Sequence, residues 1–266
     1  MITGIDHVVV LVGDLPAAIT QYESAGFDVR RGGVHPGAGT ENALIAFADG
    51  SYLELLAVSD PLQAASHPLW HRPDGQRRRA GEYGGFAVGT DDIDRDVERL
   101  LDQGIAMTSP REGSRLRMDE TVVRWRVSFP RRADLPFLIE DVTARELRVP
   151  PPRGGLGLRS SINEVRVAGA GLSATGAAYR HLLATPALGA APIGGEIHFL
   201  TPRGEITVLQ GDERDAGIQE LVLSVADWRV ATRDLLSVLD RRGSTWHVPR
   251  ERTAGARLVL RPKAGG

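Results

Sequence analysis

The chain has 266 residues, enough for one large domain or two domains of ordinary size. Its 25% charged residues and net charge of -2 give no electrostatic reason to expect binding to nucleic acid or to an acidic membrane. With no cysteine, a disulfide, a thiolate nucleophile and a sulfur-ligated metal are excluded, and any metal must bind His, Asp or Glu. We therefore expect a cytoplasmic protein whose partner is a small molecule.

The first segment, MITGIDHVVVLVG, is predicted to be a strand. Its apolar run has no basic region before it and ends at Gly13 and Asp14, so it is typical neither of a signal peptide nor of a membrane span. Asp14 as an N-cap, with Pro16 in the first turn, predicts a helix over 14–27. Two apolar runs around a short turn then predict an antiparallel hairpin over 43–58.

The same order of elements recurs four times along the chain. Strand-like segments begin at residues 4, 84, 162 and 217. Helix-like segments follow them at 14–27, 91–105, 171–188 and 227–243, and the third is weakened by two glycines. Further strands follow the last three helices, at 121–142, 195–212 and 256–262. The repeated order is therefore a strand, a helix, and then two or three strands.

One segment is typical of a domain linker. Three consecutive prolines, 150–152, precede three glycines in "RVPPPRGGLG". Consecutive prolines stiffen the chain and remove backbone donors, so this stretch fits neither a helix nor the middle of a sheet. We place a boundary near residue 152, which divides the chain into domains 1–150 and 158–266.

The repeated pattern resembles the vicinal oxygen chelate superfamily of glyoxalases, bleomycin resistance proteins and dioxygenases. Within it, the first half is similar to the glyoxalase-like domain family. The motifs that carry this resemblance are Asp6 and His7 in "IDHVVV", "GGVHPGAGTEN" at 32–42, "YLELL" at 52–56, "RW" at 124–125 and "LPFLIED" at 135–141. The resemblance implies an α+β fold of four βαβββ modules, paired into two curled mixed sheets, of which the first holds a cup-shaped site.

In this superfamily, a metal-binding module places a histidine on its first strand and a carboxylate on its last. His7 and Glu54 stand at these positions, and strand alternation puts His7 on the same face as Ile5 and Val9. Gly85 stands where the second module should supply its histidine, so the resemblance implies an incomplete site. Two interpretations stay open: His7 and Glu54 hold one divalent metal ion, or they act as an acid and base pair.

His35 lies in a loop of glycines and a proline, where a ligand can approach the backbone closely. Thr40 and Asn42 add a hydroxyl and an amide on the way into the strand that leads to Glu54. His35 is either a surface histidine in a turn or the group that completes the site. Trp125 alternates with apolar neighbours and either forms the floor of a pocket or belongs to the core.

The second half departs from this pattern. Glu164 and Glu220 stand at the position of His7, and Thr207 stands where Glu54 would be. We interpret the two glutamates as solvent-facing strand residues, although two opposed carboxylates could also hold a hard cation. The second half is then a degenerate pair of modules that acts as a structural, lid or dimerisation element, and a homodimer is expected on that basis.

Two functions stay open. The first is an isomerase, lyase or hydrolase that acts on a small oxygenated metabolite, with or without a divalent metal. Its catalytic residues would be His7, His35 and Glu54, its metal ligands His7 and Glu54, and its substrate contacts Thr40, Asn42 and Trp125. The second is a metal-free protein that binds and sequesters an antibiotic or another metabolite, which the missing ligand at Gly85 favours.

Overall fold

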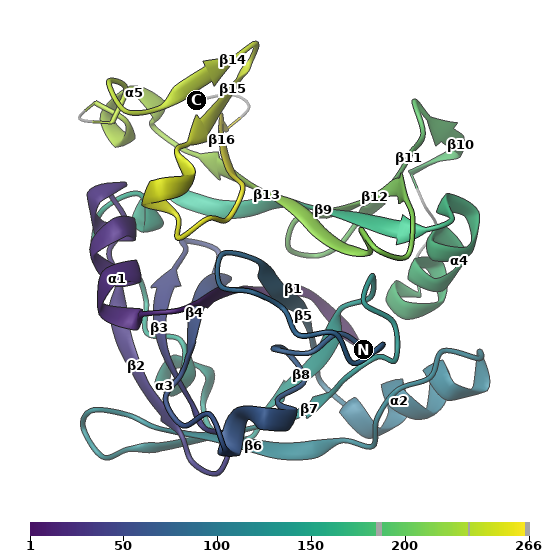
Figure 1. The fold of residues 1–266 in the computed structure, drawn as a ribbon. Helices are drawn as coiled ribbons and strands as arrows, with labels where there is room; N and C mark the ends of the chain where they lie inside the picture. Colours follow the sequence, from purple (N-terminus) through teal and green to yellow (C-terminus); the bar gives the residue numbers. More distant parts are fainter. Residues whose placement is uncertain (185–187, 234, 264–266) are drawn as a thin grey trace.

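A computed structural model of the chain describes residues 1–184, 188–233 and 235–263 (Figure 1). Its first half is rich in strands and has only short helices. The elements of this half are β1 (Ile2–Val12), α1 (Leu15–Ser24), β2 (Arg30–His35), β3 (Thr40–Ala46), β4 (Tyr52–Val58), β5 (Tyr83–Thr90), α2 (Ile93–Asp102), β6 (Arg111–Leu116), β7 (Val122–Ser128), β8 (Phe137–Asp141) and α3 (Arg145–Arg148).

The second half repeats the order of a strand, a helix and three strands. Its elements are β9 (Ser160–Ala170), α4 (Leu172–Leu183), β10 (Leu188–Ile193), β11 (Glu196–Leu200), β12 (Glu205–Gly211), β13 (Gly217–Val225), α5 (Trp228–Ala231), β14 (Asp240–Arg242), β15 (Thr245–Val248) and β16 (Leu258–Pro262). The segment before β9 contains the three prolines and one short 3-10 helix, Gly157–Arg159, and an isolated bridge from Gly155 to Phe27 holds it against the first half.

The strands form two mixed sheets, so the expected α+β class is observed. The first sheet is a closed barrel in the order β1-β4-β3-β2-β6-β7-β8-β5, whereas an open curled sheet was expected. The barrel closes because β2 meets β6 through the single pair Val34 and Leu116. The second sheet stays open, in the order β10-β11-β12-β9-β13-β16-β15-β14.

One hydrophobic core joins the two halves. Val8 and Val10 on the outer face of β1 belong to the same buried cluster as Val165 and Val167 of β9. The second sheet therefore lies across the side of the barrel that β1 and β5 form, as Figure 1 shows. The opposite faces of the same barrel strands point inward, where a smaller apolar cluster forms.

The first two predicted helices are observed with the expected start signals. The Asp14 carboxylate accepts a hydrogen bond from the Ala17 amide at 2.8 Å, which caps α1. The helix predicted over 227–243 is wrong beyond its first turn, because its end forms a hairpin around Gly243, whose φ is 60°. The predicted segment 171–188 is helical to Leu183, and its residues 185–187 lie outside the described part of the chain.

No helix in the described residues is both long enough and apolar enough to cross a membrane.

Candidate active site

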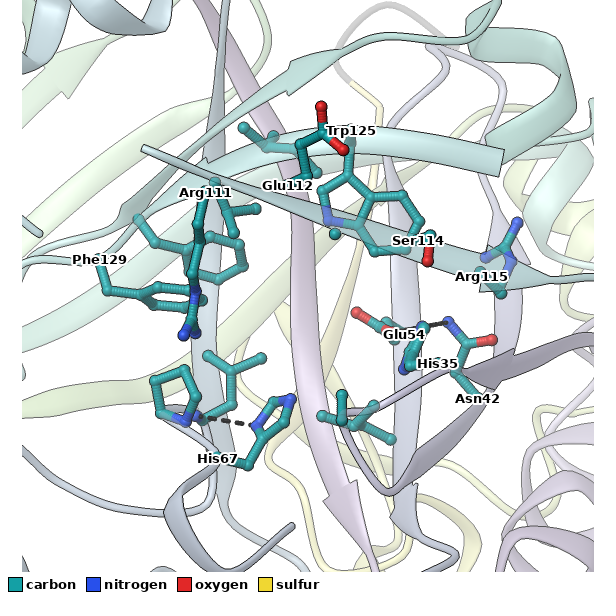
Figure 2. A pocket seen from close by; sticks show the side chains of 18 of the residues that line it. His35, Asn42, Glu54, His67, Arg111, Glu112, Ser114, Arg115, Trp125 and Phe129 are labelled. Carbon is teal, nitrogen blue, oxygen red and sulfur yellow. Dashed lines mark hydrogen bonds and ion pairs between the residues drawn. The ribbon is translucent and has the colours of Figure 1, made fainter. Parts of the chain in front are cut away.

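A cavity of about 360 Å³ lies inside the barrel. Seven strands of the barrel line it: β1 to β4 and β6 to β8. Residues 36–38 and the connection that contains the short 3-10 helix Gln63–Ser66 complete the lining. Most of the side chains singled out from the sequence meet here, and Figure 2 shows several of them facing one another. They are His7, His35, Asn42, Glu54 and Trp125.

His7 points into the cavity because β1 is irregular next to it. The register of β1 against β5 shifts between Ile5 and His7. As a result Ile5 packs in the outer core, whereas Val9 belongs to the apolar cluster inside the barrel. The expectation that His7 shares a face with Ile5 is therefore wrong, and the shift lets Asp6 and His7 both turn inward.

Asp6 fixes the orientation of His7. The Asp6 Oδ1 atom lies 2.7 Å from His7 Nδ1, and the His7 ring stacks on Tyr52 with a centroid distance of 4.5 Å. Arg148 makes two hydrogen bonds of 3.0 Å to the Asp6 carboxylate, and Arg145 pairs with it as well. Burial alone would raise the pKa of Asp6, but the Arg148 charge and the His7 hydrogen bond hold it well below its usual value. The charged Asp6 therefore leaves His7 Nε2 free to face the cavity.

Glu54 is a buried carboxylate with no arginine beside it. Its Oε1 accepts a hydrogen bond of 2.7 Å from Asn42 Nδ2, and its Oε2 lies 3.5 Å from His7 Nε2. Burial would raise the pKa of Glu54, but its interactions with His7 and His35, the Asn42 hydrogen bond and the more distant Arg115 charge lower it overall. In the part of the chain that the structure describes, no arginine or lysine lies within ion-pair distance of Glu54. Glu54 is thus ionised, with two imidazoles and an amide as its polar neighbours.

His35 also faces the cavity and is uncharged at neutral pH. Its Nδ1 lies 2.8 Å from Thr40 Oγ1, and its Nε2 lies 3.3 Å from Asn42 Nδ2 and 4.0 Å from Glu54 Oε1. Burial lowers the pKa of His35 to about 4, although the Glu54 charge acts in the opposite direction. With its proton on Nδ1, His35 donates to Thr40 Oγ1 and accepts at Nε2 from Asn42 Nδ2; with its proton on Nε2, Nδ1 instead accepts from the Thr40 hydroxyl.

The predicted substrate contacts differ in position. Asn42 and Trp125 line the cavity, whereas Thr40 is buried behind His35 and does not. Thr40 therefore positions His35 instead of contacting a ligand. Asn42 can take its place only because residue 32 is glycine, since a Cβ there would lie 2.0 Å from Asn42 Oδ1.

The donor set does not fit a complete metal centre. No group of three or more His, Asp or Glu side chains suited to a metal ion occurs among the described residues. At Gly85, where a third ligand was expected, a Cβ would instead meet Leu69 at 3.6 Å and Phe137 at 3.9 Å. The Asn42 amide directs its N–H groups at the oxygen of Glu54 and the nitrogen of His35 that would otherwise bind a cation.

Among the cavity residues, sequence reasoning missed Arg111 and Arg115, and it rated His67 as a weak signal. Arg111 and Arg115 come from β6, which has almost no apolar residue and therefore gives no alternating signal. His67 lies in a proline-containing connection, and its spacing from His71 is only a weak sequence signal. Burial lowers the pKa of His67 to about 4, so it is also neutral at neutral pH.

The second sheet has a different set of charged residues at the matching positions. The strand register places Glu164 where β1 has His7, and Thr207 where β4 has Glu54. Glu164 is buried and pairs with Arg166 and Arg261, so its interpretation as a solvent-facing residue is wrong. The paired arginines neutralise the carboxylate that the open sheet buries.

A family model described as "Glyoxalase-like domain" matches residues 5–183, which is more than half of the chain. The chain belongs to the glyoxalase-like domain family. This is the branch of the vicinal oxygen chelate superfamily that the sequence motifs predict. No curated protein matches this glyoxalase-like protein in sequence.

Two solved structures that align with nearly the whole chain share its fold at low sequence identity. A hypothetical protein from Staphylococcus aureus is 14% identical with a TM-score of 0.70, over 97% of this chain and 99% of that one. A mutant of 4-hydroxymandelate synthase from Streptomyces coelicolor is 15% identical with a TM-score of 0.59, over 100% and 94% of the two chains. Methylmalonyl-CoA epimerase from Mycobacterium tuberculosis is 22% identical with a TM-score of 0.38, over 53% and 90%.

Proposed function

We propose that this glyoxalase-like protein is an enzyme that transfers protons on a small oxygenated metabolite held in the barrel cavity. An isomerisation or a lyase step next to a carbonyl group is the reaction class that suits the site best. The observation that carries this proposal is Glu54, an ionised carboxylate that faces the cavity without an arginine partner.

The side chains divide into proton carriers and the groups that hold them. Glu54 Oε2 takes a proton from the carbon next to the substrate carbonyl, because a carboxylate without a cation keeps its capacity to accept one. In the tautomer with its proton on Nε2, His35 gives that proton to the adjacent substrate oxygen. His7, held at Nδ1 by Asp6, places its Nε2 3.5 Å from Glu54 Oε2 and so positions the base. No step passes through a metal ion.

The cavity also has groups that suit a substrate with an anionic end. The Arg111 guanidinium lies over the Phe129 ring, 5.2 Å from its centroid, and pairs with no carboxylate among the described residues. Trp125 stands edge-on to His35 with a centroid distance of 5.8 Å, and Phe137 covers the adjoining wall. Arg111 would orient a carboxylate while the aromatic rings exclude water from the reacting carbon.

A second function, sequestration of a metabolite without reaction, is favoured by one observation. Leu69 and Phe137 line the space at Gly85, so an apolar wall stands where the second module of the superfamily would supply its histidine. Apolar walls with a few polar groups are typical of binding pockets in general. The two functions share the cavity and differ in whether a bound compound exchanges a proton.

The organisation of the chain supports a site in one half only. We interpret the four groups of a strand, a helix and three strands as βαβββ modules, of which those in 1–150 form the site. Residues 158–266 are a second, degenerate pair in this interpretation. A homodimer and a cytoplasmic location stay predictions from the sequence.

Hydrogen–deuterium exchange at carbon tests the proposed function. The protein is incubated in D2O with a panel of 2-oxo acids, 2-hydroxy ketones and malonate-type acids, and carbon-bound protons are followed by NMR. We expect exchange with the wild type and a loss of about 10²- to 10⁴-fold in Glu54→Gln. Ser66→Ala, which also alters the cavity lining, should change the rate by less than about threefold.

The same experiment separates the two functions. A panel compound that binds the wild type without any exchange would favour sequestration. Exchange that survives undiminished in Glu54→Gln would contradict the assignment of Glu54 as the base.

A further inference from the structure

A second, smaller hollow of about 140 Å³ lies where β2, β3 and β6 meet the proline segment. Its lining is strongly basic. The charged residues around it are Arg30, Arg31, Arg115, Arg117, Arg153 and Asp28. Five arginines against one aspartate form a local concentration of positive charge in a chain whose net charge is -2.

Only two of these arginines have carboxylate partners. Arg30 lies 3.2 Å from Asp28, and Arg117 lies 3.0 Å from Asp119. The other three are Arg31, Arg115 and Arg153. None of them forms an ion pair with a carboxylate in the part of the chain that the structure describes. The protein itself therefore leaves most of the charge of this hollow uncompensated.

Arg115 is the innermost of the three and is almost completely buried, with 3% of its surface exposed. Its Nη2 donates a hydrogen bond of 2.7 Å to the Arg148 carbonyl, but its Nε has no partner. Its Nη1 lies beside Gly32, which lines the hollow, since a Cβ on Gly32 would be 3.3 Å from it. Glu54 acts on this charge only from beyond ion-pair distance, so the buried guanidinium is incompletely compensated, and an anion in the hollow would lower the cost of burying it.

The other two unpaired arginines are exposed and stand at the rim. Pro150 and Pro152 form a stiff part of the wall between them. Guanidinium groups on a floor and a rim can approach one anion from several sides, which suits the tetrahedral oxygens of a phosphate. A recess with its key cation buried at the base favours a small ligand over an extended membrane surface.

We propose that this hollow binds the phosphate group of a small metabolite. The site is separate from the cavity that contains Glu54, and Arg115 is the one residue that lines both. It does not depend on the proposed proton transfer, because none of the rim arginines lines the cavity.

Calorimetric titration with inorganic phosphate and with pyrophosphate tests this proposal. We expect saturable binding at one site in the wild type, and affinity at least about tenfold weaker in the double variant Arg31→Ser/Arg153→Ser. Both substitutions are at exposed positions, so the fold should be retained. Arg214→Ser removes another exposed arginine in the loop between β12 and β13 and should leave the affinity unchanged.

Further measurements distinguish this site from its alternatives. Arg31 and Arg153 do not line the cavity, so the double variant should lose phosphate affinity whether or not the proposed reaction takes place, and failure of that reaction would leave this result intact. Absence of saturable binding, or equal affinity in the double variant, would overturn the proposal. Binding to vesicles that contain phosphatidic acid, with no binding of soluble phosphate, would overturn it in favour of a membrane surface.

Discussion

Glu54 in the barrel and Glu164 in the second sheet are both buried glutamates, but their partners differ. Glu54 lies among two imidazoles and an amide. Glu164 lies 2.6 Å from Arg166 and 3.2 Å from Arg261. Glu164 is therefore fixed in an ion-pair network, whereas Glu54 has no arginine or lysine of the described residues within ion-pair distance and faces a cavity. The contrast indicates chemistry in the barrel and structural stabilisation in the second sheet.

Within the barrel, the same distinction separates Asp6 from Glu54. Asp6 is a buried carboxylate of this half that pairs with Arg145 and Arg148. It does not line the cavity itself, but it contacts His7 and Arg148, which do. The barrel therefore has two buried carboxylates with different surroundings. Asp6 is held by arginines and orients His7, whereas Glu54 has no arginine in ion-pair distance and faces the cavity. Each prediction below tests one side of this contrast.

The largest expected change in stability comes from breaking the buried ion pairs of Asp6. Arg148→Met should lower the free energy of unfolding by about 3 kcal/mol, because it leaves a buried carboxylate with only Arg145 for compensation. Arg261→Met, at a side chain that is 40% exposed, should cost less than about 1 kcal/mol. Urea unfolding of the two variants measures both values. Equal losses would show that burial does not separate the two ion-pair networks.

The next effect depends on pH. The pKa of His35 is about 4 in the folded chain and 6.5 ordinarily, so the unfolded chain binds the proton first as the pH falls. The resulting stability is fully present above about pH 6.5 and is lost towards pH 4, with about 2 kcal/mol gone near pH 5. His35→Gln should lose less stability than the wild type over this range. Parallel curves of unfolding free energy against pH would refute the uncharged state of His35.

The smallest effect is expected from metal removal. Because the Asn42 amide directs its N–H groups at the Glu54 oxygen and the His35 nitrogen that a cation would need, dialysis against a chelator should shift the melting temperature of the wild type by less than about 1 °C. Differential scanning fluorimetry with and without added Mn²⁺ or Zn²⁺ provides the measurement. A large stabilisation by a metal that disappears in His7→Ala would mean that the Asn42 amide reorients to admit a cation.

The sequence predicted those parts of the fold that depend on local signals. Alternating apolar residues located the hairpin of β3 and β4, and Asp14 located the start of α1. The closed barrel could not be predicted, because it depends on one backbone pair between Val34 and Leu116. Strand β6 was not predicted because it has almost no apolar residues and therefore no alternating pattern. Its polar side chains line the cavity and the basic hollow.

For the candidate site, the resemblance to a known family located His7 and Glu54, and the glycine-rich loop drew attention to His35. The sequence could not show whether His7, His35 and Glu54 lie together, because one register shift in β1 decides where His7 points. Arg115 gave no signal at all. A net charge of -2 hides the basic hollow, because the arginines gather there only in the folded chain.

The most direct test of the central claim compares Glu54→Gln with Glu164→Gln. Both substitutions remove the charge of a buried glutamate, and glutamine has nearly the same volume as the glutamate it replaces. In deuterium exchange at carbon, Glu54→Gln should reduce the rate by at least about 10²-fold, and Glu164→Gln should change it by less than about twofold. Equal rates in the two variants would contradict the assignment of the barrel carboxylate as the base.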